Sequence, residues 1–314
     1  MRVTASTLRT TFAASITALL AFASTASAAN VYVFSTGNPA ADAAYASTLT
    51  AQGHTVTIGG PWSTFDGTVS LNGFDVVLMN HGANWVGLGE VPVAGQQQLV
   101  AFVTSGGGLI TTEWLVYNHG VYGGAPYATL MPIVPVTYGS FWNGSPSTTL
   151  SVVEPDSVLN DSLPDTFDIP LVNFAGGTET RLTARDGAAI YYRSSNISSG
   201  SIVGAGVAGW IVGEGRVMSF SSMPGPDSLA NPNYATLLGN AVDWATLGQG
   251  PCGYDYNRDE VIDLMDAQQM AQVFVGLIPA DPTWLDGDFN GDENADLTDA
   301  RLLAQYVVSG ICPF

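Results

Sequence analysis

Aspartate and asparagine residues recur at matching offsets in the last quarter of the chain. A shift of 33 positions places Asp255 on Asp288 and Asp266 on Asp299, and the oxygen-bearing residues between them coincide as well. Oxygen ligands at positions 1, 3, 5, 9 and 12 of a 12-residue loop, with a backbone carbonyl at position 7, suit a hard cation such as Ca²⁺. The sequence therefore predicts two calcium ions. Their ligands are Asp255, Asn257, Asp259, Val261, Asp263 and Asp266 in the first loop, and Asp288, Asn290, Asp292, Asn294, Asp296 and Asp299 in the second.

The residues around these loops favour a folded module over two solvated acidic turns. Apolar residues follow each loop at three- and four-residue spacing, as in an amphipathic helix, and Leu264 falls on Leu297 under the same shift. Two solvated turns would explain neither the positions of the acids nor their duplication. The loops depart from the usual pattern at position 6, where Glu260 and Glu293 replace the Gly of the sharp turn.

A second set of reactive side chains precedes the calcium loops. Glu113 and His81 are candidates for acid/base catalysis or metal binding, because carboxylate and imidazole serve both roles. Their spacing matches no fixed ligand motif, so polar residues that simply line a binding cleft are the alternative. The other residues expected in this ligand cleft are Thr36, Asn38, Asn80, Ser221 and Ser222.

These side chains require an α/β framework to bring them together. Strands are expected at 31–35, 54–58, 74–79, 108–112, 188–192 and 216–220, and helices at 40–51, 96–103 and 234–245. Alternation of strands and helices at these spacings implies parallel pairing with right-handed crossovers. The predicted fold class is therefore α/β, with a flavodoxin-like parallel sheet. Such sheets bind ligands beyond the carboxyl ends of their strands, where the candidate residues would gather.

The start of the chain and its charge indicate an exported protein. Residues 1–28 combine a basic start, an apolar stretch and the cleavage pattern Ala26-Ser27-Ala28, so a signal peptide is expected and the mature chain would be secreted. The 27 acids against 8 Arg, with no Lys, exclude nucleic-acid binding and Lys-dependent catalysis. No later apolar run reaches the length of a membrane span.

Cys252 and Cys312 are expected to form a disulfide, with free thiols as the alternative.

Residues 29–246 resemble the ThuA-like branch of the class I glutamine amidotransferase-like fold. The motifs are 74–78 (FDVVL), 99–110 (LVAFVTSGGGLI), 213–217 (GEGRV) and 238–245 (LGNAVDWA). The amidotransferases carry a Cys just after the strand that corresponds to 108–112, whereas this chain has Thr112-Glu113-Trp114 there and no Cys in the domain. Cys-dependent amide hydrolysis is therefore excluded. The resemblance implies a domain that binds or acts on carbohydrate in polysaccharide metabolism.

After a linker at 247–251, residues 252–314 resemble a type I dockerin, a small all-α domain with two calcium loop–helix halves. The resemblance implies docking to a cohesin-type partner through Leu264-Met265 and Leu297-Thr298; a calcium-stabilised module without a partner is the alternative.

Two function classes are open for the whole protein. One is a secreted carbohydrate-active hydrolase carried by its dockerin-like tail, and the other is a non-enzymatic extracellular interaction protein whose calcium loops are structural.

Overall fold

The computed structural model describes residues 28–80, 89–171, 179–247, 255–259, 261–281, 284–285, 287, 289 and 294–309. Residues 1–27 of the expected signal peptide, His81, and the cysteines at 252 and 312 lie outside this range, as do Glu260, Asp288, Asn290, Asp292 and Glu293. Within the described residues, no helix is both long and apolar enough to cross a membrane.

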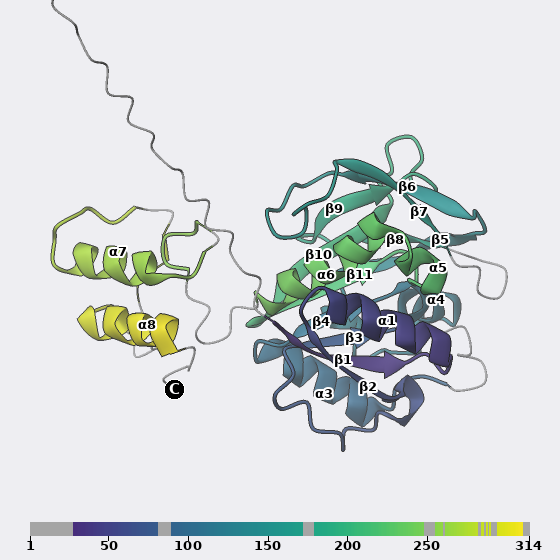
Figure 1. Cartoon of the computed structure of the whole chain (residues 1–314), viewed down its shortest axis with the longest axis horizontal. Coiled ribbons are helices and arrows are strands. Elements are labelled where there is room, and N and C mark those ends of the chain that lie inside the picture. Colours follow the sequence, from purple (N-terminus) through teal and green to yellow (C-terminus); the bar gives the residue numbers. More distant parts are fainter. Residues whose placement is uncertain are drawn as a thin grey trace, which may run out of the picture.

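In the described part of the chain, nine strands form one mixed sheet (Figure 1). Its order is β2 (Thr55–Pro61), β1 (Asn30–Ser35), β3 (Val76–Met79), β4 (Gly108–Thr111), β11 (Gly215–Phe220), β10 (Ala205–Val212), β9 (Ala189–Ser194), β6 (Ser147–Val152) and β7 (Thr166–Pro170). The first five strands pair in parallel, in the flavodoxin-like order, and the other four add in antiparallel fashion. A separate two-stranded ribbon pairs β5 (Val136–Asn143) with β8 (Glu179–Ala184).

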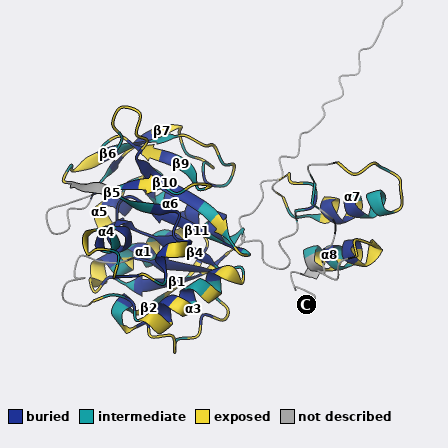
Figure 2. Ribbon diagram, turned by 180° about the vertical axis from the view of Figure 1, so that it is seen from behind, coloured by how far each residue is buried: buried dark blue, intermediate teal, exposed yellow. Residues whose placement is uncertain are grey.

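Helices cover both faces of the parallel strands. On one face lie α1 (Pro39–Ala51), the short α5 (Pro226–Leu229) and α6 (Pro232–Thr246); on the other lie α3 (Val93–Thr104) and α4 (Glu113–Val121) with the β5–β8 ribbon. Successive side chains of a strand point to opposite faces, so Val31 and Val33 join the α6 side while Tyr32 and Phe34 join the α3 side. Of the parallel strands, β3 and β4 are buried throughout (Figure 2).

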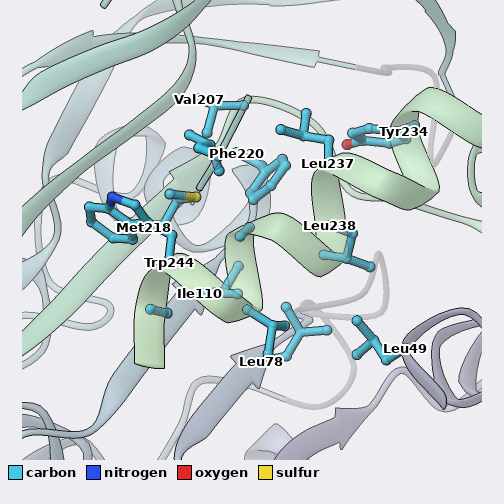
Figure 3. Packing of buried hydrophobic residues seen from close by; sticks show 14 of the residues in the cluster. Leu49, Leu78, Ile110, Val207, Met218, Phe220, Tyr234, Leu237, Leu238 and Trp244 are labelled. Carbon is cyan, nitrogen blue, oxygen red and sulfur yellow. The ribbon is translucent and has the colours of Figure 1, made fainter. Parts of the chain in front are cut away.

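The helix α6 is held on the sheet by its apolar side chains and is capped at its start. Leu237, Leu238 and Trp244 project from α6 toward Leu78 of β3 and Ile110 of β4 (Figure 3). The helix begins at Asn231, whose side-chain oxygen accepts the N–H groups of residues 233 and 234, and Pro232 occupies the first turn. The expected helix at 234–245 is therefore confirmed and is longer by two residues at its start and one at its end.

The prediction of a wholly parallel sheet is wrong for the second half of the domain. Each expected strand is present within three residues of its bounds, but β5, β6, β7, β8 and β10 were not predicted. β10 is apolar throughout, but it contains Gly206 and Gly209, and glycine is uncommon in strands. The other four strands belong to antiparallel pairs with one partly exposed face; β7, for example, alternates exposed and buried residues. Such alternation lacks the continuous apolar run that marks a strand buried on both faces, the signal used for the parallel strands.

The C-terminal segment contains α7 (Leu264–Phe274) and α8 (Leu297–Ser309), each directly after a predicted calcium loop. Its buried cluster is internally symmetric, because each member in the first half has its counterpart 33 residues later. The pairs are Tyr256 with Phe289, Ala267 with Ala300 and Met270 with Leu303. The sequence repeat is thus also a repeat in the packing of the described residues.

Candidate functional site

The carboxyl ends of the parallel strands place most of the predicted site residues along one edge of the sheet. Thr36 follows β1, Asn80 follows β3, Glu113 follows β4, and Ser221 and Ser222 follow β11. These five residues are buried, whereas Asn38, the remaining residue of the predicted cleft, is exposed. His81 comes next after Asn80 but lies outside the described residues.

Glu113 is the first residue of α4 and is 1 % exposed. Its Oε2 accepts a long hydrogen bond from the Thr180 hydroxyl (3.4 Å). Within the described residues no well-aligned hydrogen bond reaches Oε1, although the backbones of Thr180 and Met223 lie close enough to lower the pKa somewhat. The preceding Thr112 has φ −119°, and neither residue has a positive φ, so the strained turn of a catalytic Cys is not reproduced here.

A second buried carboxyl, which sequence reasoning missed, lies beside Glu113. Glu179 opens β8 and is fully buried; its Oε1 accepts a 2.6 Å hydrogen bond from the Ser221 hydroxyl. The Thr180 N–H donates to the Ser221 carbonyl (3.0 Å), which ties the start of β8 to the end of β11. The sequence reasoning looked for site residues only after parallel strands, and Glu179 does not follow one. It could have been found only by predicting β8 and its pairing with β5.

Burial makes both carboxyls costly to ionise, and the charge of Glu179 makes Glu113 costlier still. Burial raises the pKa of Glu113 well above its usual value, and the nearby Glu179 raises it further. Burial also raises the pKa of Glu179, to about 6, although hydrogen bonds from Ser194, Ser221 and Asn196 favour its charged form. Two interacting acids in this state titrate as a pair, so one holds a proton while the other is ionised over part of the neutral range.

Buried hydroxyl groups extend this polar cluster toward α6 and α1. The Ser222 hydroxyl lies 2.8 Å from the Tyr234 hydroxyl, and the Tyr45 hydroxyl donates to the Pro224 carbonyl (2.5 Å). Burial raises the pKa of Tyr234, and both Glu113 and Glu179 add to this rise. Asn80 lies beside Tyr45 and lowers the pKa of that phenol, against the dominant effect of burial. The cluster therefore offers neutral hydroxyl donors around two acids.

Two of the predicted cleft residues have local structural partners. Thr36 donates to Asp42 Oδ1 from its backbone N–H (2.8 Å) and its hydroxyl (2.7 Å). Asn38 caps α1, because its side-chain oxygen accepts the N–H groups of Ala40 and Ala41. Their predicted contact with a ligand stays a prediction.

The first predicted calcium loop is closed by hydrogen bonds among its own ligands. The Asp259 N–H donates to Asp255 Oδ1 (3.2 Å) and Asn257 Oδ1 (2.9 Å). The two carboxylate oxygens of Asp266 accept the N–H groups of Asn257 (3.1 Å) and Asp263 (2.9 Å). Asp266, the last predicted ligand, thus contacts the beginning of the loop. Asp263 also caps α7.

The second loop repeats this arrangement where it is described. The Asp296 N–H donates to Asp299 Oδ2 (2.8 Å), and the Thr298 N–H donates to Asp296 Oδ1 (2.6 Å). Asp266 and Asp299 are both fully buried. Burial raises the pKa of Asp266, and the neighbouring Asp255 and Asp259 add to the rise, so a cation there would offset repulsion.

These observations fit a calcium ion chemically, because the donors are carboxylate, amide and carbonyl oxygens in a compact loop. Among the described residues, however, no three Asp, Glu, His or Cys side chains converge as a metal-binding group. Asp288, Asn290 and Asp292 of the second loop lie outside the described range. Calcium binding therefore stays a prediction.

Comparisons with known proteins identify the fold alone. No family model matches the chain, and no curated protein matches its sequence. A cytoplasmic protein of Salmonella typhimurium is 15% identical with a TM-score of 0.50, and a second one from the LT2 strain is 13% identical with 0.51; each alignment covers 69% of this chain and 98% of the other. A protein of Bacteroides uniformis described as ThuA-like is 13% identical with a TM-score of 0.50, covering 69% of this chain and 90% of that one. The ThuA-like fold of the α/β part is thus confirmed.

Proposed function

We propose that this chain is an exported, calcium-binding protein whose α/β part acts on carbohydrate through the paired carboxyls of Glu113 and Glu179. The observation that carries the proposal is the meeting of two buried acids, from α4 and β8, at the carboxyl edge of the parallel strands. Ligands of open α/β sheets bind at this edge. Two acids with raised and unequal pKa values provide the proton donor and the proton acceptor that hydrolysis of a glycosidic bond requires.

The roles follow from the environment of each carboxyl. Glu113, whose pKa is raised well above normal, would stay protonated and give its proton to the leaving glycosidic oxygen. Glu179, whose pKa is about 6 and whose Oε1 accepts the Ser221 hydroxyl, would be ionised and would take a proton from the attacking water. The bond between the anomeric carbon and the leaving oxygen breaks as the bond to water forms.

One observation favours the second candidate function, a non-enzymatic interaction protein. Glu113 and Glu179 are no more than 1 % exposed, and burial of this kind is also what a structural hydrogen-bond network shows. In that case the acids would hold β8 against the end of β11, and the function would depend on the surface of the protein.

A hydrolysis assay separates the two functions. The protein is incubated with a panel of neutral oligosaccharides, and new reducing ends are measured for the wild type, Glu113→Gln and Glu179→Gln. Glu214→Gln is the matched control, because this residue lies in the β10–β11 turn at the opposite edge of the sheet. The enzyme proposal expects the wild type and the control to be active and both other variants to lose at least about 100-fold, as for a missing general acid or base. Activity that survives in both variants, or a wild type that cleaves nothing on the panel, contradicts it.

The C-terminal segment supports the proposal of a calcium-dependent docking module. Leu264, Met265 and Leu297 are 51 %, 47 % and 51 % exposed, on corresponding turns of α7 and α8. Exposed apolar side chains at the start of both helices suit a protein partner of the cohesin type. Loss of binding to a cohesin panel in Leu264→Asp, with retained calcium binding, would support this contact; unchanged binding would contradict it.

A further inference from the structure

We propose that Tyr117, Tyr122 and Tyr138 form a stacking subsite for a neutral pyranose unit, next to the Glu113 carboxyl. This set is called the tyrosine shelf below. The inference deepens the proposed function and rests on it only for the position of the reacting bond, since the shelf would also bind sugar in a protein without catalysis.

The helix α4 sets the distance between the shelf and the acids. Glu113 and Tyr117 are four residues apart and therefore neighbours on one face of the helix, one turn from each other. Tyr122 caps the end of the same helix and is 47 % exposed. The helix thus carries Tyr117 one turn after the buried acid and Tyr122 at its exposed end.

The β5–β8 ribbon supplies the rest of the shelf and the second acid. Tyr138 of β5 pairs in register with Leu182 of β8, the strand that Glu179 opens. The rings of Tyr117 and Tyr138 lie 5.9 Å apart between centroids and are nearly perpendicular, at 86°. The helix α4 packs against β5 and β8 (Figure 1). These three elements therefore carry both carboxyls, Tyr117 and Tyr138, and Tyr122 caps the helix.

The close approach of α4 to β5 fixes the shelf in place. A Cβ atom at Gly120 would lie 2.3 Å from the Tyr138 Cβ, so only glycine allows the helix to pack this near the strand. Trp114 is 5 % exposed and packs edge-to-face against Tyr117, with 5.5 Å between the ring centroids and an interplanar angle of 76°. Rings held by such packing lose little conformational entropy when a ligand binds.

The chemistry of the shelf favours a neutral sugar. Tyrosine offers an apolar ring face for the C–H face of a pyranose and a hydroxyl for its polar rim. The Tyr117 and Tyr138 rings are in contact, and the pKa of Tyr117 is raised by burial and further by Tyr138, Tyr122 and Glu113. Sugar hydroxyls can donate to this group of oxygens, whereas the formal charge of −19 and the absence of Lys disfavour an anionic polysaccharide.

Binding of neutral oligosaccharides to the full-length protein tests the shelf. Titration calorimetry is run for the wild type, Tyr122→Ala and Tyr117→Phe, with Val121→Ala as the control because Val121 is an exposed apolar residue of the same helix. Tyr122→Ala is expected to weaken binding about tenfold, and Tyr117→Phe, which keeps the ring, is expected to weaken it less. Circular dichroism of each variant confirms that the fold is kept.

The outcomes separate the shelf from the acid/base pair. If Glu113→Gln and Glu179→Gln abolish cleavage but keep sugar affinity within about threefold, both proposals stand. If the wild type binds sugar through Tyr122 but cleaves nothing, the shelf stands and the catalytic proposal fails. Unchanged affinity in Tyr122→Ala, or no binding to any neutral oligosaccharide of the panel, overturns the shelf.

Discussion

Replacing Glu179 by Gln should make the protein less sensitive to rising pH. Glu179 is fully buried, and burial raises its pKa from 4.5 to about 6. A group whose pKa is raised by folding stabilises the native state below the unfolded pKa, and that stability is lost as the pH rises through the folded pKa. The wild type therefore loses free energy of unfolding between about pH 4.5 and pH 7.5, as Glu179 is forced to ionise.

The size of the effect follows from the shift. Since one pKa unit corresponds to about 1.4 kcal/mol, a rise from 4.5 to about 6 costs about 2 kcal/mol of stability above pH 7. Glutamine keeps the shape but cannot ionise, so the variant avoids this loss. It also removes the charge that raises the pKa of Glu113, which adds to the gain at high pH.

Urea unfolding followed by tryptophan fluorescence, in saturating calcium, measures this loss at about pH 4.5, 6.0 and 7.5. The stability of Glu179→Gln relative to the wild type should increase by about 1.6 kcal/mol from the lowest to the highest pH, since part of the loss has already occurred at pH 4.5, and the relief of Glu113 adds to this gain. A constant offset from the new amide does not affect this comparison. Glu214→Gln controls for the loss of one acid. If the free energy of unfolding depends on pH in the same way for the wild type and for Glu179→Gln, the reasoning is refuted.

Three further predictions concern other parts of the chain. Calorimetry should give two calcium ions per chain for the wild type and about one for Asp266→Asn. The control Asp227→Asn, in α5, should keep two. A wild type that binds less than one calcium ion per chain would contradict the prediction of two calcium loops. Gly120→Ala should destabilise the protein by about 1–3 kcal/mol, seen as a lower urea midpoint, because its Cβ would meet Tyr138; a neutral effect contradicts the close contact. Intact mass of the secreted protein should show a chain that begins near Ala29 and lacks free thiols at Cys252 and Cys312; two free thiols or a retained leader would be the opposite result.

The parallel half of the domain could be predicted because its strands are buried on both faces. Runs such as Val76–Met79 are apolar throughout, and they alternate with helices, so the order and the carboxyl edge follow. That edge in turn placed Asn80, Glu113 and Ser221 together. The loop–helix repeat was visible for a similar reason, since it recurs at one fixed spacing.

Glu179 and the tyrosine shelf could not be predicted in this way. Both depend on the β5–β8 ribbon, whose strands come from distant parts of the chain and do not join the main sheet. The strands of this ribbon interrupt their apolar residues with polar ones, so neither shows the continuous apolar run of a strand buried on both faces. The partner of Glu113 is thus a product of long-range pairing, which local pattern does not encode.

The central claim is that Glu113 and Glu179 share protons as a coupled buried pair. Carbon-13 labelling of glutamate side chains gives seven carboxyl signals in this chain, and assigned variants identify the two that matter. An NMR titration of the native protein should show the Glu179 signal changing near pH 6 and the Glu113 signal changing well above pH 4.5. The Glu113 signal should titrate at lower pH in Glu179→Gln, because that variant lacks the neighbouring charge. Two independent titrations near pH 4.5 would contradict the account.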